Sequence, residues 1–74
     1  MAVTDLASPV TGSIWKLVSA VGDTVAEGQE LLVVESMKME FPLEAPHAGV
    51  VAAIAVAEGD HVKAGDHVIS LALQ

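Results

Sequence analysis

A single lysine near the middle of the chain is the residue best placed to do chemistry. Lys38 lies between Met37 and Met39, in a run that begins with Glu35-Ser36 and ends with Glu40. A lysine amine held on an exposed turn can be acylated by another enzyme. The two methionines offer a soft, adaptable surface to such an enzyme, and they could equally pack beneath the turn. The run therefore predicts a modification site, although an exposed lysine taken alone would be an ordinary turn residue.

Other constellations that could carry chemistry do not occur in the sequence. A metal site needs ligands at close spacing on one element, and the candidate ligands lack that spacing. These candidates are His47, His61, His67, Asp60 and Asp66. No G-x-S-x-G elbow exposes a serine nucleophile, and no glycine-rich phosphate loop is present. We therefore expect no metal and no catalytic residue, so a small enzyme is the least supported class of function.

The composition indicates one small β domain and excludes two classes of partner. The chain has 74 residues, no cysteine and 53% hydrophobic residues, including twelve valines and twelve alanines. Small β-branched side chains suit a thin, curved β core. Three basic residues against ten acidic ones argue against nucleic acid and against an anionic membrane surface as partners. Trp15 could mark a protein partner's surface, although a half-buried strand position is the simpler interpretation.

An internal repeat surrounds Lys38. A shift of 37 positions places Ser8–Glu35 on Ala45–Ala72, and all six glycines then pair with one another. The pairs are Gly12 with Gly49, Gly22 with Gly59, and Gly28 with Gly65. Glycines occur where the backbone needs positive φ or a close approach, so matched glycines imply matched turns. The repeat predicts a pseudo-symmetric fold with Lys38 in the short stretch between the two copies.

Turn signals recur at short intervals and separate β-prone runs, which is typical of an all-β sandwich or barrel. Glycine and proline interrupt the chain too often for a helix of ordinary length. Alanine content alone would allow a helix at Val50–Ala57, but the repeat partner Ser13–Ala20 is β-branched and aromatic. We expect eight strands at about Val3–Leu6, Ser13–Val18, Thr24–Val25, Glu30–Ser36, Met39–Glu44, Val50–Val56, His61–Val62 and His67–Leu73.

Two of these strands, Glu30–Ser36 and Met39–Glu44, are separated only by Met37-Lys38. This spacing predicts a two-residue hairpin loop with Lys38 exposed at its tip. Such loops favour turns with positive φ at one or both central residues, and therefore Asn-Gly or Asp-Gly. Met-Lys is a poor choice for that conformation, and a broken local rule often marks a functional position. The sequence leaves the turn type open.

The run Glu35-Ser36-Met37-Lys38-Met39 resembles the attachment signature of biotinyl domains, the biotin carboxyl carriers of biotin-dependent carboxylases. The resemblance extends to Gly22-Asp23, to Ala45-Pro46 with Gly49, and to Glu58-Gly59-Asp60, and it covers essentially the whole chain. The gaps between the expected strands are too short for the "thumb" loop that some relatives carry. The chain therefore looks like the small, free-standing carriers of this family.

The resemblance implies a fold for the chain. We expect one biotinyl domain over residues 1–74, with internal repeats at about 8–35 and 45–72. Its architecture would be all-β, a flattened barrel-sandwich of two four-stranded antiparallel sheets related by a quasi-twofold axis, without a thumb. As an isolated domain it would be a monomer, because its acidic surface offers no evident self-complementary patch.

The resemblance also implies a function. Biotin would be the cofactor, attached covalently to Lys38 by biotin protein ligase, with Met37 and Met39 as flanking recognition residues and Glu35 and Ser36 as part of the motif. The arm would carry a carboxyl group from biotin carboxylase to carboxyltransferase, most simply in acetyl-CoA carboxylase and fatty acid biosynthesis. The chain itself would be a non-catalytic carrier subunit.

Two alternative functions remain open for the chain. A lipoyl carrier domain of a 2-oxoacid dehydrogenase-type complex resembles this chain, but its signature usually reads Asp-Lys-Ala, so Met37 and Met39 favour biotin. An unmodified interaction module is the other alternative.

The longest apolar run, Val50–Ala57, is far shorter than the roughly 20 residues that a spanning helix needs. No basic segment precedes an apolar one at the N-terminus, so we expect no signal peptide and a cytoplasmic location.

Overall fold

Eight strands make up the regular structure in the computed structural model, which describes residues 2–73. They are β1 (Val3–Ala7), β2 (Gly12–Leu17), β3 (Thr24–Val25), β4 (Glu30–Ser36), β5 (Met39–Glu44), β6 (Gly49–Ile54), β7 (His61–Val62) and β8 (His67–Leu73). All eight expected strands are present, and five have the expected bounds. The strand β6 ends at Ile54 rather than Val56, because the Asp60 carboxylate accepts the amide of Ala57 and turns the chain.

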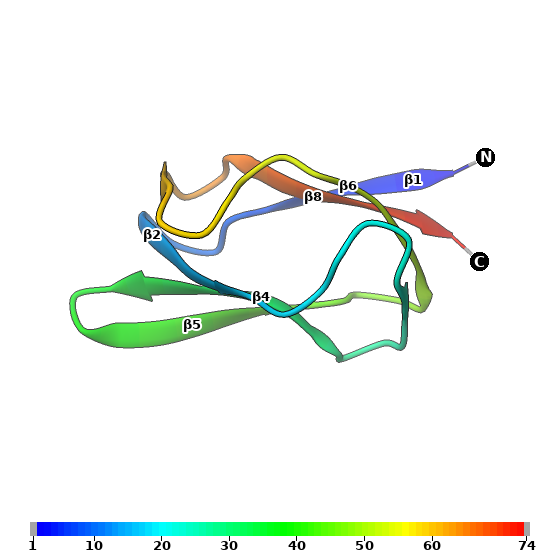
Figure 1. Cartoon of the computed structure of the whole chain (residues 1–74), viewed down its shortest axis with the longest axis horizontal. Helices are drawn as coiled ribbons and strands as arrows, with labels where there is room; N and C mark the ends of the chain where they lie inside the picture. Colours follow the sequence, from blue (N-terminus) through cyan, green and yellow to red (C-terminus); the bar gives the residue numbers. More distant parts are fainter. Residues whose placement is uncertain (1, 74) are drawn as a thin grey trace.

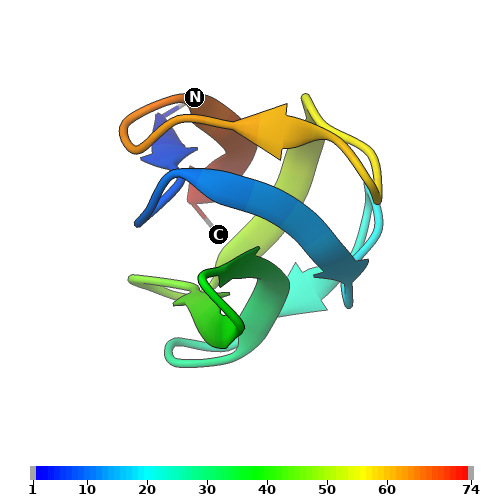
Figure 2. The ribbon, with the colours of Figure 1, turned by 90° about the vertical axis from the view of Figure 1, so that its left-hand side faces the viewer.

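The strands form two four-stranded antiparallel sheets, as the resemblance to biotinyl domains implied. One sheet has the order β1-β8-β6-β3 and the other the order β5-β4-β2-β7. The two orders are equivalent under the internal repeat: adding four to each strand number of the first sheet, with β1 counted after β8, gives the order of the second sheet. The sheets remain separate, so the barrel is not closed and the fold is a flattened sandwich (Figure 1). Viewed along the long axis, strands of both sheets surround a common interior (Figure 2).

The interior is filled by branched aliphatic side chains from both sheets. The largest fully buried side chains are Ile14, Leu31, Leu32, Val34, Val51, Val68, Ile69 and Leu71. Burial of each such side chain stabilises the fold by about 1.5–3 kcal/mol. The strand β4 buries four consecutive residues, so it is covered on both faces, as its unbroken apolar run indicates. No helix among residues 2–73 has the length and apolar character needed to cross a membrane.

Turns of each repeat form hydrogen bonds with the other repeat. The amide of Gly22 donates to the carbonyl of Val51, and 37 positions later the amide of Gly59 donates to that of Ile14. Gly22 and Gly59 have φ values of 96° and 92°, a conformation that glycine adopts without strain. Because these bonds cross between the repeats, neither half can form its turns fully without the other.

The aspartates that close these turns provide a stability test of the repeat. Asp23 accepts the amide of Ala20, and Asp60 accepts that of Ala57, each at 2.9 Å. We expect Asp23→Ala and Asp60→Ala each to lower the free energy of unfolding by about 1 kcal/mol, because each leaves a turn amide without its acceptor. Urea unfolding measures both, with Glu27→Ala as the near-neutral control. A loss confined to one of the two variants would contradict the equivalence of the turns.

Candidate functional site

The turn that carries Lys38 is a two-residue hairpin loop, as predicted. In the β4–β5 ladder Ser36 pairs with Met39, which leaves only Met37 and Lys38 in the loop. Their φ values are 52° and 65°, and they are the only non-glycine residues with positive φ among residues 2–73. Positive φ at both central positions identifies a type I′ turn. This conformation costs roughly 1–2 kcal/mol per residue for side chains other than glycine, so the hairpin tip holds Met and Lys against local preference.

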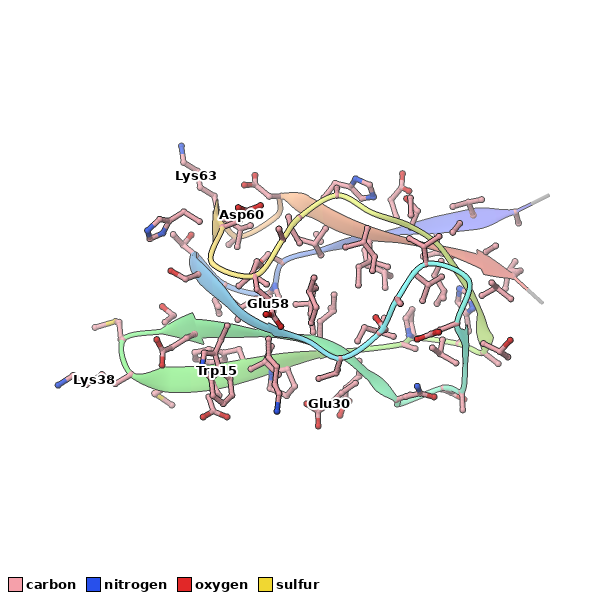
Figure 3. The ribbon with its side chains drawn as sticks, in the orientation of Figure 1. Trp15, Glu30, Lys38, Glu58, Asp60 and Lys63 are labelled. Carbon is pink, nitrogen blue, oxygen red and sulfur yellow. The ribbon has the colours of Figure 1, made fainter. Side chains whose placement is uncertain are left out.

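The hairpin tip projects from one end of an elongated molecule. The structure measures 36 × 17 × 16 Å, and the hairpin lies at the end of the long axis opposite the outer ends of β1 and β8 (Figure 1). Lys38 is exposed, and its side chain points away from both sheets (Figure 3). Met37 is 92% exposed and Met39 is 60% exposed, so Met37 does not pack beneath the turn. The tip therefore presents an accessible amine between two accessible thioethers.

The base of the hairpin is held rigidly by the strands around it. Val34 is fully buried in β4, and its partner in β5 is Phe41, which packs partly exposed. On the other side, β2 approaches so closely at Gly12 that a Cβ atom there would collide with the carbonyl oxygen of Glu35. The result is a mobile side chain on a fixed base, which suits an attachment point for a group that must move.

The remaining motif residues lie at the last pairs of the ladder. Ser36 is partly buried, whereas Glu35 is exposed and pairs with Glu40. Farther from the tip, Glu30 pairs with Glu44. The ladder therefore contains two pairs in which one glutamate lies directly opposite another. These glutamate pairs were not predicted, although the two-residue loop implies their register. Like charges directly opposite each other are destabilising.

An open groove of about 520 Å³ lies beside the hairpin. It is lined by Trp15, Lys16, Val18, Gln29, Glu30, Val33 and Glu40. The ammonium of Lys16 lies 5.8 Å from the centroid of the Trp15 ring, within the range of a cation–π interaction. Trp15 lies in β2 and is 49% exposed, which confirms the half-buried strand position, whereas its role at a partner's surface stays a prediction. The groove was not predictable from strand alternation, because a bulge between Ile14 and Lys16 leaves Trp15 without a partner in β4.

The histidines do not meet in one site. His47 lies 2.9 Å from the Thr4 hydroxyl, and His61 lies 3.4 Å from that of Ser13. No group of three or more His, Cys, Asp or Glu residues within 2–73 could hold a metal ion.

One histidine does lie beside a serine and an aspartate. His67 Nε2 is 2.9 Å from Ser70 Oγ, and that hydroxyl donates to Asp5 at 3.0 Å. In a hydrolase the imidazole would take the serine proton. Here the carboxylate receives that hydroxyl's hydrogen bond, and the cluster is exposed, so it does not activate a nucleophile.

Comparisons with known proteins agree with this geometry. A family model described as "Biotin-requiring enzyme" matches residues 1–71. The chain is 45% identical over 71 residues to the biotin carboxyl carrier protein of Streptococcus mutans, covering 96% of this chain and 55% of that protein. It is 40% identical over 62 residues to the biotin/lipoyl attachment protein of Bacillus subtilis, covering 84% of this chain and 85% of that one. This chain thus spans about half the length of the streptococcal relative.

A solved structure shows the same likeness. The urea carboxylase of Kluyveromyces lactis superposes with a TM-score of 0.89 at 39% sequence identity. The match covers 96% of this chain and 6% of that one, so the similarity concerns one small part of a long polypeptide.

Proposed function

Because this chain belongs to the family of biotin-requiring enzymes, we propose that Lys38 is the residue to which its biotin is attached. The chain is a biotin carrier domain of the biotin-dependent carboxylases, and it is the carrier rather than the catalytic part. Biotin is its covalently bound cofactor. The observation that carries the assignment to Lys38 is the projecting type I′ hairpin, which holds an exposed amine between two exposed methionines in an unfavourable backbone conformation.

The residues at the tip fit the cofactor. An amide with biotin needs an unhindered primary amine, and the Lys38 side chain forms no ion pair in the described part of the chain. When bound, biotin supplies a ring nitrogen that accepts and releases a carboxyl group. The chain contributes a stiff hairpin base and a flexible lysine side chain, which together keep the attached group at a high effective concentration near enzymes that bind the carrier.

We further propose the partners and the acceptor. Biotin protein ligase would load Lys38, biotin carboxylase would charge the arm, and carboxyltransferase would discharge it to an acyl-CoA, with acetyl-CoA and fatty acid biosynthesis as the first choice. Similarity to separate carrier and attachment proteins supports a carrier of this kind. Urea is the second candidate acceptor, because the fold is shared with a urea carboxylase. We place the carrier in the cytoplasm, and we expect a monomer because its acidic composition offers no evident self-complementary patch.

Loading in the presence of a ligase tests the assignment to Lys38. We expect co-expression with biotin protein ligase and free biotin to add one biotinyl group per chain, detected by intact mass and by avidin binding. Lys38→Arg should abolish loading, because arginine keeps the charge but cannot form the amide. The matched controls Lys16→Arg and Lys63→Arg should load fully, since these are the other two lysines of the chain. Biotin found on Lys16 or Lys63, or lipoate found on Lys38, would overturn the assignment.

A further inference from the structure

Two facing pairs of glutamates distinguish the outer surface of the β4–β5 hairpin. Glu35 lies opposite Glu40 and Glu30 lies opposite Glu44, and all four are exposed. None of them forms an ion pair within residues 2–73. Opposed like charges destabilise a ladder, so this arrangement works against the stability of the hairpin. We call these four residues the acidic face. Because none of its charges is paired within residues 2–73, a positively charged partner can provide the opposite charges.

The groove beside the acidic face supplies an apolar centre. Trp15, Val18 and Val33 form its apolar part, and Glu30 and Glu40 belong both to the groove and to the acidic face. Val33 is buried but stands outside the core cluster, which places it on the outer side of the sheet. Trp15 and Glu30 lie along the sheet that bears the Lys38 hairpin (Figure 3). An exposed tryptophan with apolar neighbours and a charged rim is the usual anatomy of a protein-binding hot spot.

The position of this surface relative to Lys38 selects the partner. Glu40 is only two residues from Lys38, roughly 7 Å along the strand. An enzyme that acylates the lysine must bring its active site to the Nζ atom itself, so its body must lie against the hairpin. Enzymes that act on the ring meet it at the far end of the loaded arm, beyond Nζ and farther from the hairpin.

We propose that the groove and the acidic face form the docking surface for biotin protein ligase, whose matching surface carries arginine or lysine residues around an apolar side chain that sits against Trp15. This inference rests on the proposed function and names the part of the chain that the ligase recognises. The ammonium of Lys16, held over Trp15, is the one cation that lines the groove. Since it repels a basic partner, its removal should strengthen docking.

Steady-state loading of the full chain by purified ligase, ATP and biotin tests the proposal, with kcat/KM for the chain as the readout. We expect Trp15→Ala to lower kcat/KM by about tenfold or more, and Trp15→Phe to restore most of it. Glu30→Lys with Glu40→Lys should lower it by about tenfold at low salt, with a smaller loss at high salt. Lys16→Gln should raise it severalfold at low salt.

The matched control is Asp5→Lys with Glu27→Lys, which changes the net charge equally at two residues that do not line the groove. Urea unfolding shows that each variant is folded. If the control loses as much kcat/KM as the hairpin pair, net charge and not a docking surface is responsible. If the wild-type chain is loaded and the Trp15 and glutamate variants have the same kcat/KM, the docking surface alone is overturned. If the wild-type chain accepts no biotin, the proposed function is overturned. Normal loading combined with impaired carboxylation of the loaded arm would assign the surface to the carboxylase instead.

Discussion

Replacing Gly12 or Gly49 by alanine is expected to lower the free energy of unfolding by about 3 kcal/mol, a large share of the total for so small a domain. A Cβ atom at Gly12 would collide with the backbone carbonyl of Glu35, and one at Gly49 with that of Ala72. Both obstacles are main-chain atoms of a neighbouring strand, so relief requires the strands to separate. The two collisions are equivalent, since glycine and carbonyl are each displaced by 37 positions.

Urea unfolding followed by circular dichroism measures these losses. Gly22→Ala is the matched control, because its Cβ atom would meet nothing within 4 Å and its only penalty is a φ of 96°. We expect that control to lose about 1–2 kcal/mol. A Gly12→Ala variant as stable as the wild type would show that β2 and β4 are not in contact as described. Gly12→Ala should also disturb loading of its folded fraction more than Gly49→Ala, because only Gly12 lies against the base of the Lys38 hairpin.

Much of the fold follows from turn residues and their repetition. The paired glycines predicted matched turns, and the structure places Gly28 and Gly65 at φ values of 85° and 93°. Strand bounds followed because each strand begins or ends at an expected turn. The interlocking of the repeats could not be deduced in this way, because the hydrogen bonds from Gly22 to Val51 and from Gly59 to Ile14 join residues far apart in sequence.

The site was predictable where it depended on local spacing and unpredictable where it depended on packing. The two-residue gap between strands was enough to place Lys38 at a hairpin tip. The groove depends instead on the bulge at Ile14 and Lys16, which has a counterpart 37 positions later between Val51 and Ala53. No glycine marks either bulge, so the pattern of turn residues did not reveal them. The side-chain environment of Trp15 became apparent only with the register of β2 against β4.

Replacing Met37-Lys38 by Asn-Gly is expected to separate the stability of the hairpin from its function. Asparagine and glycine prefer the positive φ values of a type I′ turn, here 52° and 65°, so the variant should gain about 1 kcal/mol in free energy of unfolding. The same variant should take no biotin, because the acceptor amine is gone. Thermal or urea unfolding gives the first result, and intact mass after incubation with ligase gives the second.

The single variant Met37→Asn is the companion experiment, because it relaxes one strained position and keeps the amine. Its stability should lie between those of the wild type and the double variant. Its rate of loading then isolates what the Met37 side chain, 92% exposed, contributes to recognition. If Asn-Gly gave no gain in stability, Met-Lys would not be a strained choice, and the backbone argument for function at this turn would fail. A gain with complete loss of loading would mean that the tip retains an unfavourable pair of residues because one of them must be a reachable lysine.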